Sequence, residues 1–175
     1  ELVKITERET QKVDSDRHIY YSDTIANSKW ENDQKFCQKG SDLGERMKHA
    51  FKQGFIEGYR NIIVVGSDLP GISKEIIEAG FRQLKNKDIV FGPAEDGGYY
   101  LLGMSKMIPS VFDNKPWSQS NLLALTLQEL SEQGAAFAVL ETMNDIDTYK
   151  DLIESNFYQK NKVAQEIIAN LQPSK

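Results

Sequence analysis

The chain has 175 residues, of which 39% are hydrophobic and 10% aromatic. This length predicts one domain, since a domain typically contains roughly 100–200 residues. The formal net charge is −5 and the pI is near 5.1, so the chain lacks the basic field on which nucleic-acid binding depends. No apolar run approaches the roughly 18 residues of a membrane span. The single cysteine, Cys37, excludes an internal disulfide and favours a reduced, cytoplasmic protein.

Helices and strands are expected to alternate along the chain, because apolar residues recur with period three to four in some segments and form short continuous runs in others. In chain order we expect helix 1–13, strand 17–21, short strand 35–38, helix 42–57, strand 61–66, helix 73–84, strands 88–92 and 99–104, helix 119–133, strand 135–140 and two helical stretches after 148. Asp42 and Ser73 are expected to cap their helices, and Thr148 with Asp151 forms a capping-box pattern.

This alternation predicts an α/β fold with three layers, α/β/α, around a mostly parallel central sheet. The runs NIIVVG at 61–66 and DIVFG at 88–92 are typical of strands buried on both faces. In such sheets ligands bind beyond the carboxyl ends of the strands, so we expect functional residues directly after strands.

Asp68 lies in the first such segment, residues 66–71 (GSDLPG). A small residue and then an acid at the end of a strand place one carboxylate at the edge of the sheet, and Pro70 with Gly71 turns the chain away. The alternative is that Asp68 only caps a turn.

Asp96, Gly97 and Gly98 form the second segment, within GPAEDGGYY at 92–100. The glycines permit close approach of the backbone to a ligand. The alternative is a β-hairpin with an Asp-Gly turn, although the loop is longer and more acidic than a hairpin requires.

Asp145 and Asp147 lie in the third segment, NDIDTYKD at 144–151. Their side chains alternate along an extended segment, so only one of them is expected to face the site. Together with Asp68, that aspartate could share a hard divalent cation, since Mg²⁺ typically uses one or two carboxylates plus substrate phosphates. His18 and His49 are expected to be structural or exposed, and the chain lacks a ligand set for zinc.

Five stretches occur together in an order typical of one bacterial family: GSDLGERMKHAF, GSDLPG, GPAEDGGYYLLGM, PWS and DIDTYKDL. They resemble the glycosyltransferase-like family associated with arsenosugar biosynthesis, of the nucleotide-diphospho-sugar transferase superfamily with the GT-A fold. The resemblance covers residues 17–152. The long GPAEDGGYYLLG stretch is specific, whereas GSDxPG and DIDT are shared across the superfamily.

The resemblance implies that Asp68 and Asp147 bind a divalent cation, Mg²⁺ or Mn²⁺. It implies that Asp96, Gly97 and Gly98 face the sugar or acceptor, with Asp96 as the candidate general base.

Two further substrate-binding segments follow from the same resemblance. Trp117 and Ser118 resemble a loop that closes over the acceptor side. The stretch at 40–46 resembles the segment that lines the nucleotide pocket, including Asp42 and Arg46. Arg46 would contact a phosphate there, and a helix-surface arginine is the alternative.

Members of this family begin with a further strand and a Pro/Gly-rich loop that cradles the nucleotide phosphates. Neither precedes the helix at 1–13, so we expect residues 1–175 to be a single domain that is incomplete at its N-terminus. A protein that does not bind nucleotide in the usual way is the alternative.

These observations predict a metal-dependent glycosyltransferase that moves a sugar from a nucleotide-diphosphate sugar to a small-molecule acceptor. One alternative is a nucleotidyltransferase that joins a nucleoside triphosphate to a phosphorylated acceptor. The other is a non-catalytic module that binds nucleotide sugars. No nucleic acid or membrane span is expected, and the oligomeric state is left open.

Overall fold

The computed structural model describes residues 2–26, 29–146 and 148–171. Its elements are α1 (Leu2–Thr10), β1 (His18–Tyr21), β2 (Gln34–Cys37), α2 (Leu43–Ile56), β3 (Ile62–Val65), α3 (Lys74–Gln83), β4 (Ile89–Pro93), β5 (Tyr99–Met104), a 3₁₀ turn (Pro109–Val111), α4 (Leu122–Glu132), β6 (Phe137–Val139), α5 (Tyr149–Glu154), α6 (Asn156–Lys160) and α7 (Lys162–Leu171). The predicted strands and helices are confirmed with shifts at their ends, and the tail forms three short helices where two were predicted.

The main sheet has four strands in the order β3-β5-β4-β6. β5 pairs antiparallel with β3 and β4, while β6 pairs parallel with β4. β3, β4 and β6 therefore run in one direction, as predicted, and β5 runs against them because a short loop joins it to β4. Sequence periodicity carries no information about strand direction, so this reversal was not predicted.

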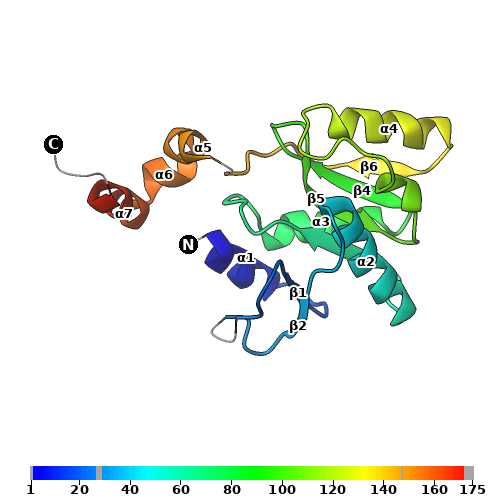
Figure 1. Ribbon diagram of the computed structural model, residues 1–175, viewed down its shortest axis with the longest axis horizontal. Coiled ribbons are helices and arrows are strands. Elements are labelled where there is room, and N and C mark those ends of the chain that lie inside the picture. Colours follow the sequence, from blue (N-terminus) through cyan, green and yellow to red (C-terminus); the bar gives the residue numbers. More distant parts are fainter. Residues whose placement is uncertain (1, 27–28, 147, 172–175) are drawn as a thin grey trace.

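Helices cover both faces of this sheet, which confirms the three-layer α/β/α fold (Figure 1). On β4 and β5 alternate residues point to opposite faces. Phe91 and Leu102 pack in a core with residues of α2 and α4. Val90 and Leu101 pack on the other face, in a core with residues of α3 and α1. This burial on both faces explains the continuous apolar runs of the two strands.

The burial of β3 differs from our prediction. Residues Ile62–Val65 are wholly apolar, and we predicted a strand buried on both faces, yet all four are only half-buried. β3 lies at the end of the four-stranded sheet, with β5 as its partner strand, so part of its surface is uncovered.

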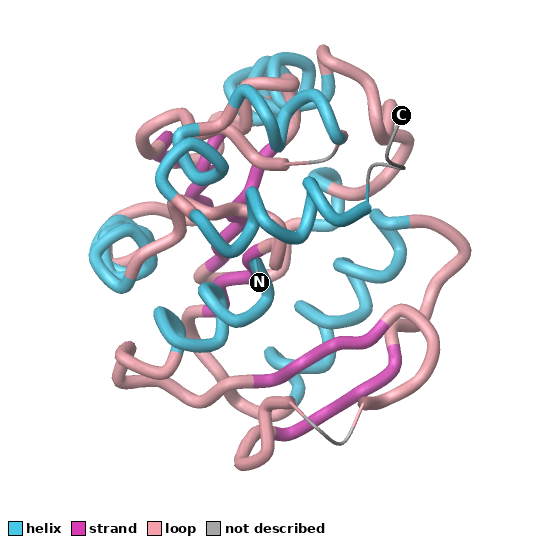
Figure 2. The backbone as a smooth tube through the Cα atoms, turned by 90° about the vertical axis from the view of Figure 1, so that its left-hand side faces the viewer, coloured by secondary structure: helices cyan, strands magenta, loops and turns pink. Residues whose placement is uncertain are grey.

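A second, two-stranded sheet is formed by β1 and β2, which pair in parallel (Figure 2). Aromatic rings contact one another across its two strands. Phe36 stacks on Tyr20 with ring centroids 5.2 Å apart and lies 5.1 Å from His18. The six strands of the described residues are therefore divided between two sheets, whereas we expected one central sheet.

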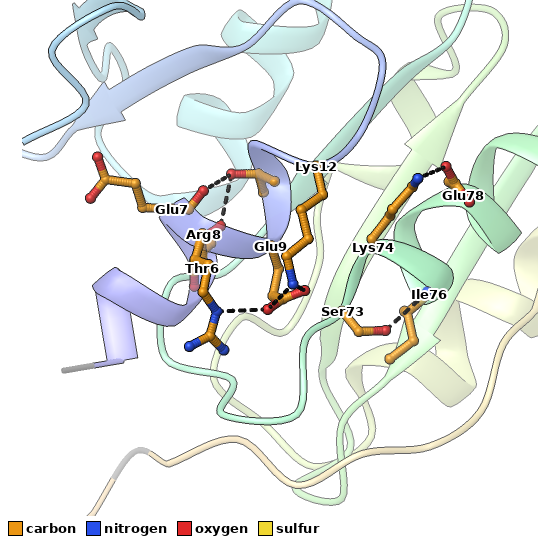
Figure 3. A network of polar contacts seen from close by, with 10 residues as sticks. Thr6, Glu7, Arg8, Glu9, Lys12, Ser73, Lys74, Ile76 and Glu78 are labelled. Carbon is orange, nitrogen blue, oxygen red and sulfur yellow. Dashed lines mark hydrogen bonds and ion pairs between the residues drawn. The ribbon is translucent and has the colours of Figure 1, made fainter.

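The polar surface of α1 lies beside α3 (Figure 3). Glu9 is buried and accepts from Lys12 and Arg8 at 2.8 Å, and the Lys12 ammonium, followed by Arg8, lowers the pKa of the Glu9 carboxyl. Ser73 caps α3 by accepting from the Ile76 N–H, as predicted.

The C-terminal helices α5, α6 and α7 extend away from the rest of the chain (Figure 1). Thr148 and Asp151 form the predicted capping box at the start of α5. Large apolar side chains are exposed on these helices, namely Tyr149, Ile153, Val163 and Ile167. Across the described part of the chain, no helix combines the length and the apolar character needed to cross a bilayer.

Candidate functional site

Three loops that follow strands meet at one edge of the four-stranded sheet. The Ile146 N–H donates to the Asp68 carbonyl at 3.3 Å, and the Glu95 N–H donates to the Met143 carbonyl at 3.0 Å. The Met143 N–H donates in turn to the Pro93 carbonyl at 3.0 Å. Because β3, β4 and β6 are parallel, these loops all leave carboxyl ends of strands. The structure thus brings together the three segments that were predicted from the sequence.

Asp68 places an exposed carboxylate at this edge. The next residue, Leu69, is 1% exposed and anchors the turn in the apolar layer between the sheet and α3. The Asp68 side chain folds back over Gly66, so that Oδ1 lies 2.6 Å from where a β-carbon of residue 66 would be. The buried anchor and the tight turn hold the carboxylate at the sheet edge.

Asp147, the second predicted metal ligand, lies outside the described residues. Its neighbour Asp145 is half-buried and adjoins Ile146, which is bonded to the Asp68 loop. Among the residues that the structure describes, no group of three or more His, Cys, Asp or Glu side chains could hold a metal ion.

The segment at 94–98 is a β-hairpin loop, which corrects our preference against that interpretation. β4 and β5 pair directly on either side of it, with Pro93 opposite Tyr99. Asp96 is exposed, and its Oδ1 accepts from the Gly98 N–H at 2.8 Å. The turn therefore orients the candidate base. Gly97 has φ +92°, and a β-carbon there would overlap the carbonyl oxygen of Ser120, so the loop requires glycine at this position.

The two tyrosines after this loop are structural. Burial raises the pKa of the Tyr99 hydroxyl far above its ordinary value, so this side chain stays a neutral phenol. Tyr100 is buried and donates its hydroxyl proton to the Glu141 carbonyl at 2.9 Å. Neither side chain is therefore available as a base at neutral pH.

Trp117 connects the acceptor-side loop to α2. Its indole ring lies so close to Gly44 that a β-carbon at residue 44 would overlap the ring. Ser118, next to it, has a left-handed backbone with φ +62°. The following residues reach the hairpin, where the Leu123 N–H donates to the Gly97 carbonyl at 3.0 Å. One loop thus touches both the hairpin and the start of α2.

Asp42 and Arg46 both form hydrogen bonds that stabilise the start of α2. Asp42 caps α2 by accepting from the Glu45 N–H at 2.8 Å. Glu45 reaches back to the N–H and hydroxyl of Ser41, both at 2.8 Å, and these bonds lower the pKa of its carboxyl. Arg46 donates to the Gly40 carbonyl and the Gln38 side chain. No contact with a phosphate is needed to explain these positions.

A cavity of about 930 Å³ brings two of the predicted residues, Asp42 and Trp117, together. It lies between α2 and the loop at 112–117 and does not include Asp68, Asp96 or Arg46 among its lining residues. Asp42 and Trp117 therefore lie in this groove, Asp68 and Asp96 lie at the sheet edge, and Arg46 belongs to neither group. The groove also contains residues that sequence reasoning missed, namely Lys39, Lys48, Lys52 and Lys115. The four-residue spacing of Lys48 and Lys52 was the available signal.

Residues 6–119 match the profile of a family described as uncharacterized proteins conserved in bacteria, DUF2064. The chain belongs to this family. No curated protein matches the sequence.

Two solved structures are similar to the chain over nearly its whole length. One is a proposed nucleotide-diphospho-sugar transferase from Desulfovibrio desulfuricans G20, with 29% identity and a TM-score of 0.80 over 97% of this chain and 80% of that one. The other is CMP:2-keto-3-deoxy-manno-octonic acid synthetase complexed with CTP, with 10% identity and a TM-score of 0.63 over 97% and 88%. At 10% identity the likeness shows the fold alone. The fold is that of the nucleotide-diphospho-sugar transferase superfamily.

Proposed function

We propose that the chain is a metal-dependent transferase that moves a sugar from a nucleotide-diphosphate sugar to a small-molecule acceptor. The observation that carries this proposal is that the Met143–Ile146 segment bonds to both the Asp68 loop and the hairpin, at the carboxyl ends of three parallel strands. The similarity to a proposed nucleotide-diphospho-sugar transferase supports the same class of activity.

Asp68 and Asp147 would hold the cation, Mg²⁺ or Mn²⁺. The donor set suits these ions, because carboxylate oxygens are the ligands that they prefer and Mg²⁺ retains open positions for substrate phosphates. The cation would neutralise charge on a diphosphate leaving group, which an acidic protein would otherwise repel.

Asp96 would accept the proton of the acceptor hydroxyl. Its Oδ1 is tied to the Gly98 N–H, so the carboxylate has a set orientation while remaining exposed to substrate. Gly97 and Gly98 would let the acceptor approach the backbone of this loop. Trp117 and Ser118 would cover the acceptor side, and Asp42 and Arg46 would line the nucleotide side as the family resemblance implies.

The resemblance to arsenosugar-type glycosyltransferases adds arsenic-containing compounds to the acceptors worth testing. A nucleotide-sugar substrate and a lone cysteine fit a cytoplasmic enzyme. A nucleotidyltransferase would use the same fold but break a bond at the α-phosphorus, so its products differ.

Product analysis tests the reaction. The purified chain is incubated with nucleotide-diphosphate sugars and Mn²⁺, and with nucleoside triphosphates and phosphorylated acceptors. Release of nucleoside diphosphate supports the proposal, whereas release of pyrophosphate from triphosphates would replace it with nucleotidyl transfer. Absence of turnover together with metal-dependent binding would favour a non-catalytic binding module.

Asp68→Asn tests the metal site. We expect the Mn²⁺-dependent affinity for nucleotide sugar to fall at least tenfold in titration calorimetry, because one anionic ligand of the cation is lost. Thermal unfolding should change little, since the side chain is exposed. Asp14→Asn, at another exposed aspartate, is the matched control and should bind normally. Equal binding by Asp68→Asn and the control would refute the assignment.

A further inference from the structure

The groove between α2 and the loop at 112–117 extends along most of the helix. Its lining residues on α2 recur along one side of the helix and include Lys48, Lys52 and Ile56. Since a helix rises about 1.5 Å per residue, the stretch from Asp42 to Ile56 spans about 21 Å. The volume of about 930 Å³ is within the range of small-molecule sites, roughly 300–1,000 Å³.

The carboxylates of the groove already have partners. Asp42 accepts from the Glu45 N–H, and Glu45 accepts from Ser41. Asp113 pairs with the Lys48 ammonium at 2.6 Å, across the groove. The negative charges on the lining are therefore engaged within the protein.

Of the four lysines that line the groove, two form ion pairs within the protein and two do not. Lys48 pairs with Asp113, and the buried Lys115 pairs with Glu129 of α4. Lys39 and Lys52 are exposed and form no ion pair with any residue in the described ranges. Lys52 lies one helical turn from Lys48 and His49, so an anion there would face several donors at once.

Trp117 gives the same groove an aromatic wall. The ring is half-buried against Gly44 and lines the cavity together with Phe112. Ligand sites commonly combine such apolar surface with a few polar groups that set orientation. The groove thus joins an aromatic surface to unpaired cations, on a chain whose net charge is −5.

We propose that this groove binds an anionic small molecule that carries a carboxylate or phosphate group. Lys52, with Lys48 and His49 beside it, receives the anionic group, and Trp117 covers the uncharged part. This inference goes beyond the proposed function, because Asp68 and Asp96 are not among the residues that line the groove.

The test uses the full chain without metal or nucleotide, so that its outcome is independent of turnover. Glycerol 3-phosphate and glycerate are titrated at matched low ionic strength while tryptophan fluorescence is followed, and glycerol is the neutral counterpart. The two tryptophans differ in position, since Trp30 is 6% exposed and Trp117 lines the groove. We expect a saturable change with one or both anions, none with glycerol, and no change in Trp117→Phe. The two anions distinguish a phosphate site from a carboxylate site.

Three variants make the test specific. Lys52→Gln should weaken anion binding at least tenfold, because it removes the unpaired ammonium. Lys162→Gln, at an exposed lysine of α7, is the matched control and should bind like the parent. Asp113→Asn should tighten binding several-fold, since Lys48 then loses its internal partner. Equal responses to glycerol and the anions, or equal losses in Lys52→Gln and Lys162→Gln, would overturn the assignment. Anion binding with these properties but without sugar transfer would refute the transferase and keep the anion site.

Discussion

The two sheets of the molecule differ in burial. All residues of β4 are buried, and five of the six residues of β5 are buried, between helices on both faces. Strand β1 is half-buried throughout, and two of the four residues of β2 are exposed. β3 is as apolar as β4 yet is half-buried, because it lies at the end of the sheet. Burial is therefore set by the number of covering elements and not by strand composition alone.

A pair of Phe→Ala variants gives the largest expected contrast. Phe91 of β4 is 0% exposed, and its truncation should lower the free energy of unfolding by about 3–5 kcal/mol. Phe36 of β2 is half-buried, and its loss should cost about 1–2 kcal/mol, since less area leaves water on folding. Urea denaturation measures both. Equal costs would show that the two-stranded sheet is as tightly packed as the larger one.

Two glycines with similar positive φ, one in the β4–β5 hairpin loop and one after α2, differ in how closely other residues surround them. Gly97→Ala should cost about 2–3 kcal/mol, from a left-handed φ of +92° and overlap with Ser120. At Gly58, φ is +96° and no atom lies within 4 Å of the added carbon, so Gly58→Ala should cost only about 1 kcal/mol for the left-handed backbone. The difference in denaturation midpoint isolates the contact with Ser120. Matching midpoints would mean that the hairpin is not anchored there.

Asp88, just before β4, provides the smallest effect. The Lys106 ammonium at 2.8 Å lowers the pKa of this carboxyl below its ordinary value. The resulting stability is present above the unfolded-state pKa of about 3.9 and is lost as pH falls through the folded-state pKa. Asp88→Asn should therefore reduce stability by about 0.5 kcal/mol at pH 7.

The Asp88→Asn difference should shrink as the pH falls below the unfolded-state pKa of about 3.9 and disappear below the folded-state pKa, and pH-dependent unfolding of both proteins measures it. Lys106→Gln should cause a similar loss, and the double variant should cost little more than either single change. A pH-independent difference would assign the effect to the bond from the Ala136 N–H instead.

Local rules predicted much of the fold. Asp42, Ser73 and Thr148 were identified as caps from their neighbours a few residues away, and each accepts a backbone N–H as expected. Asp68 was placed at the sheet edge because an acid follows a run of apolar residues. Such features depend on a few neighbouring residues, so they can be predicted without a structure.

Features that depend on distant residues were not predicted. The overlap of Gly97 with Ser120 and the pairing of Lys115 with Glu129 join residues far apart in the chain. A lysine in the polar stretch DNKPWS gave no sign that its side chain would be 1% exposed. The groove likewise arises from the packing of α2 against a loop, and no single segment contains its pattern of charges.

The uncovered side of β3 has a consequence for handling the protein. Residues Ile62–Val65 carry no charge, no proline and no bulge-forming glycine, which are the usual devices that keep edge strands from pairing with other molecules. Alternate N–H and C=O groups of an antiparallel end strand point away from its partner and can pair with another chain. Within the described residues, the edge of β3 is therefore the position at which a further strand, from this chain or another, can extend the sheet.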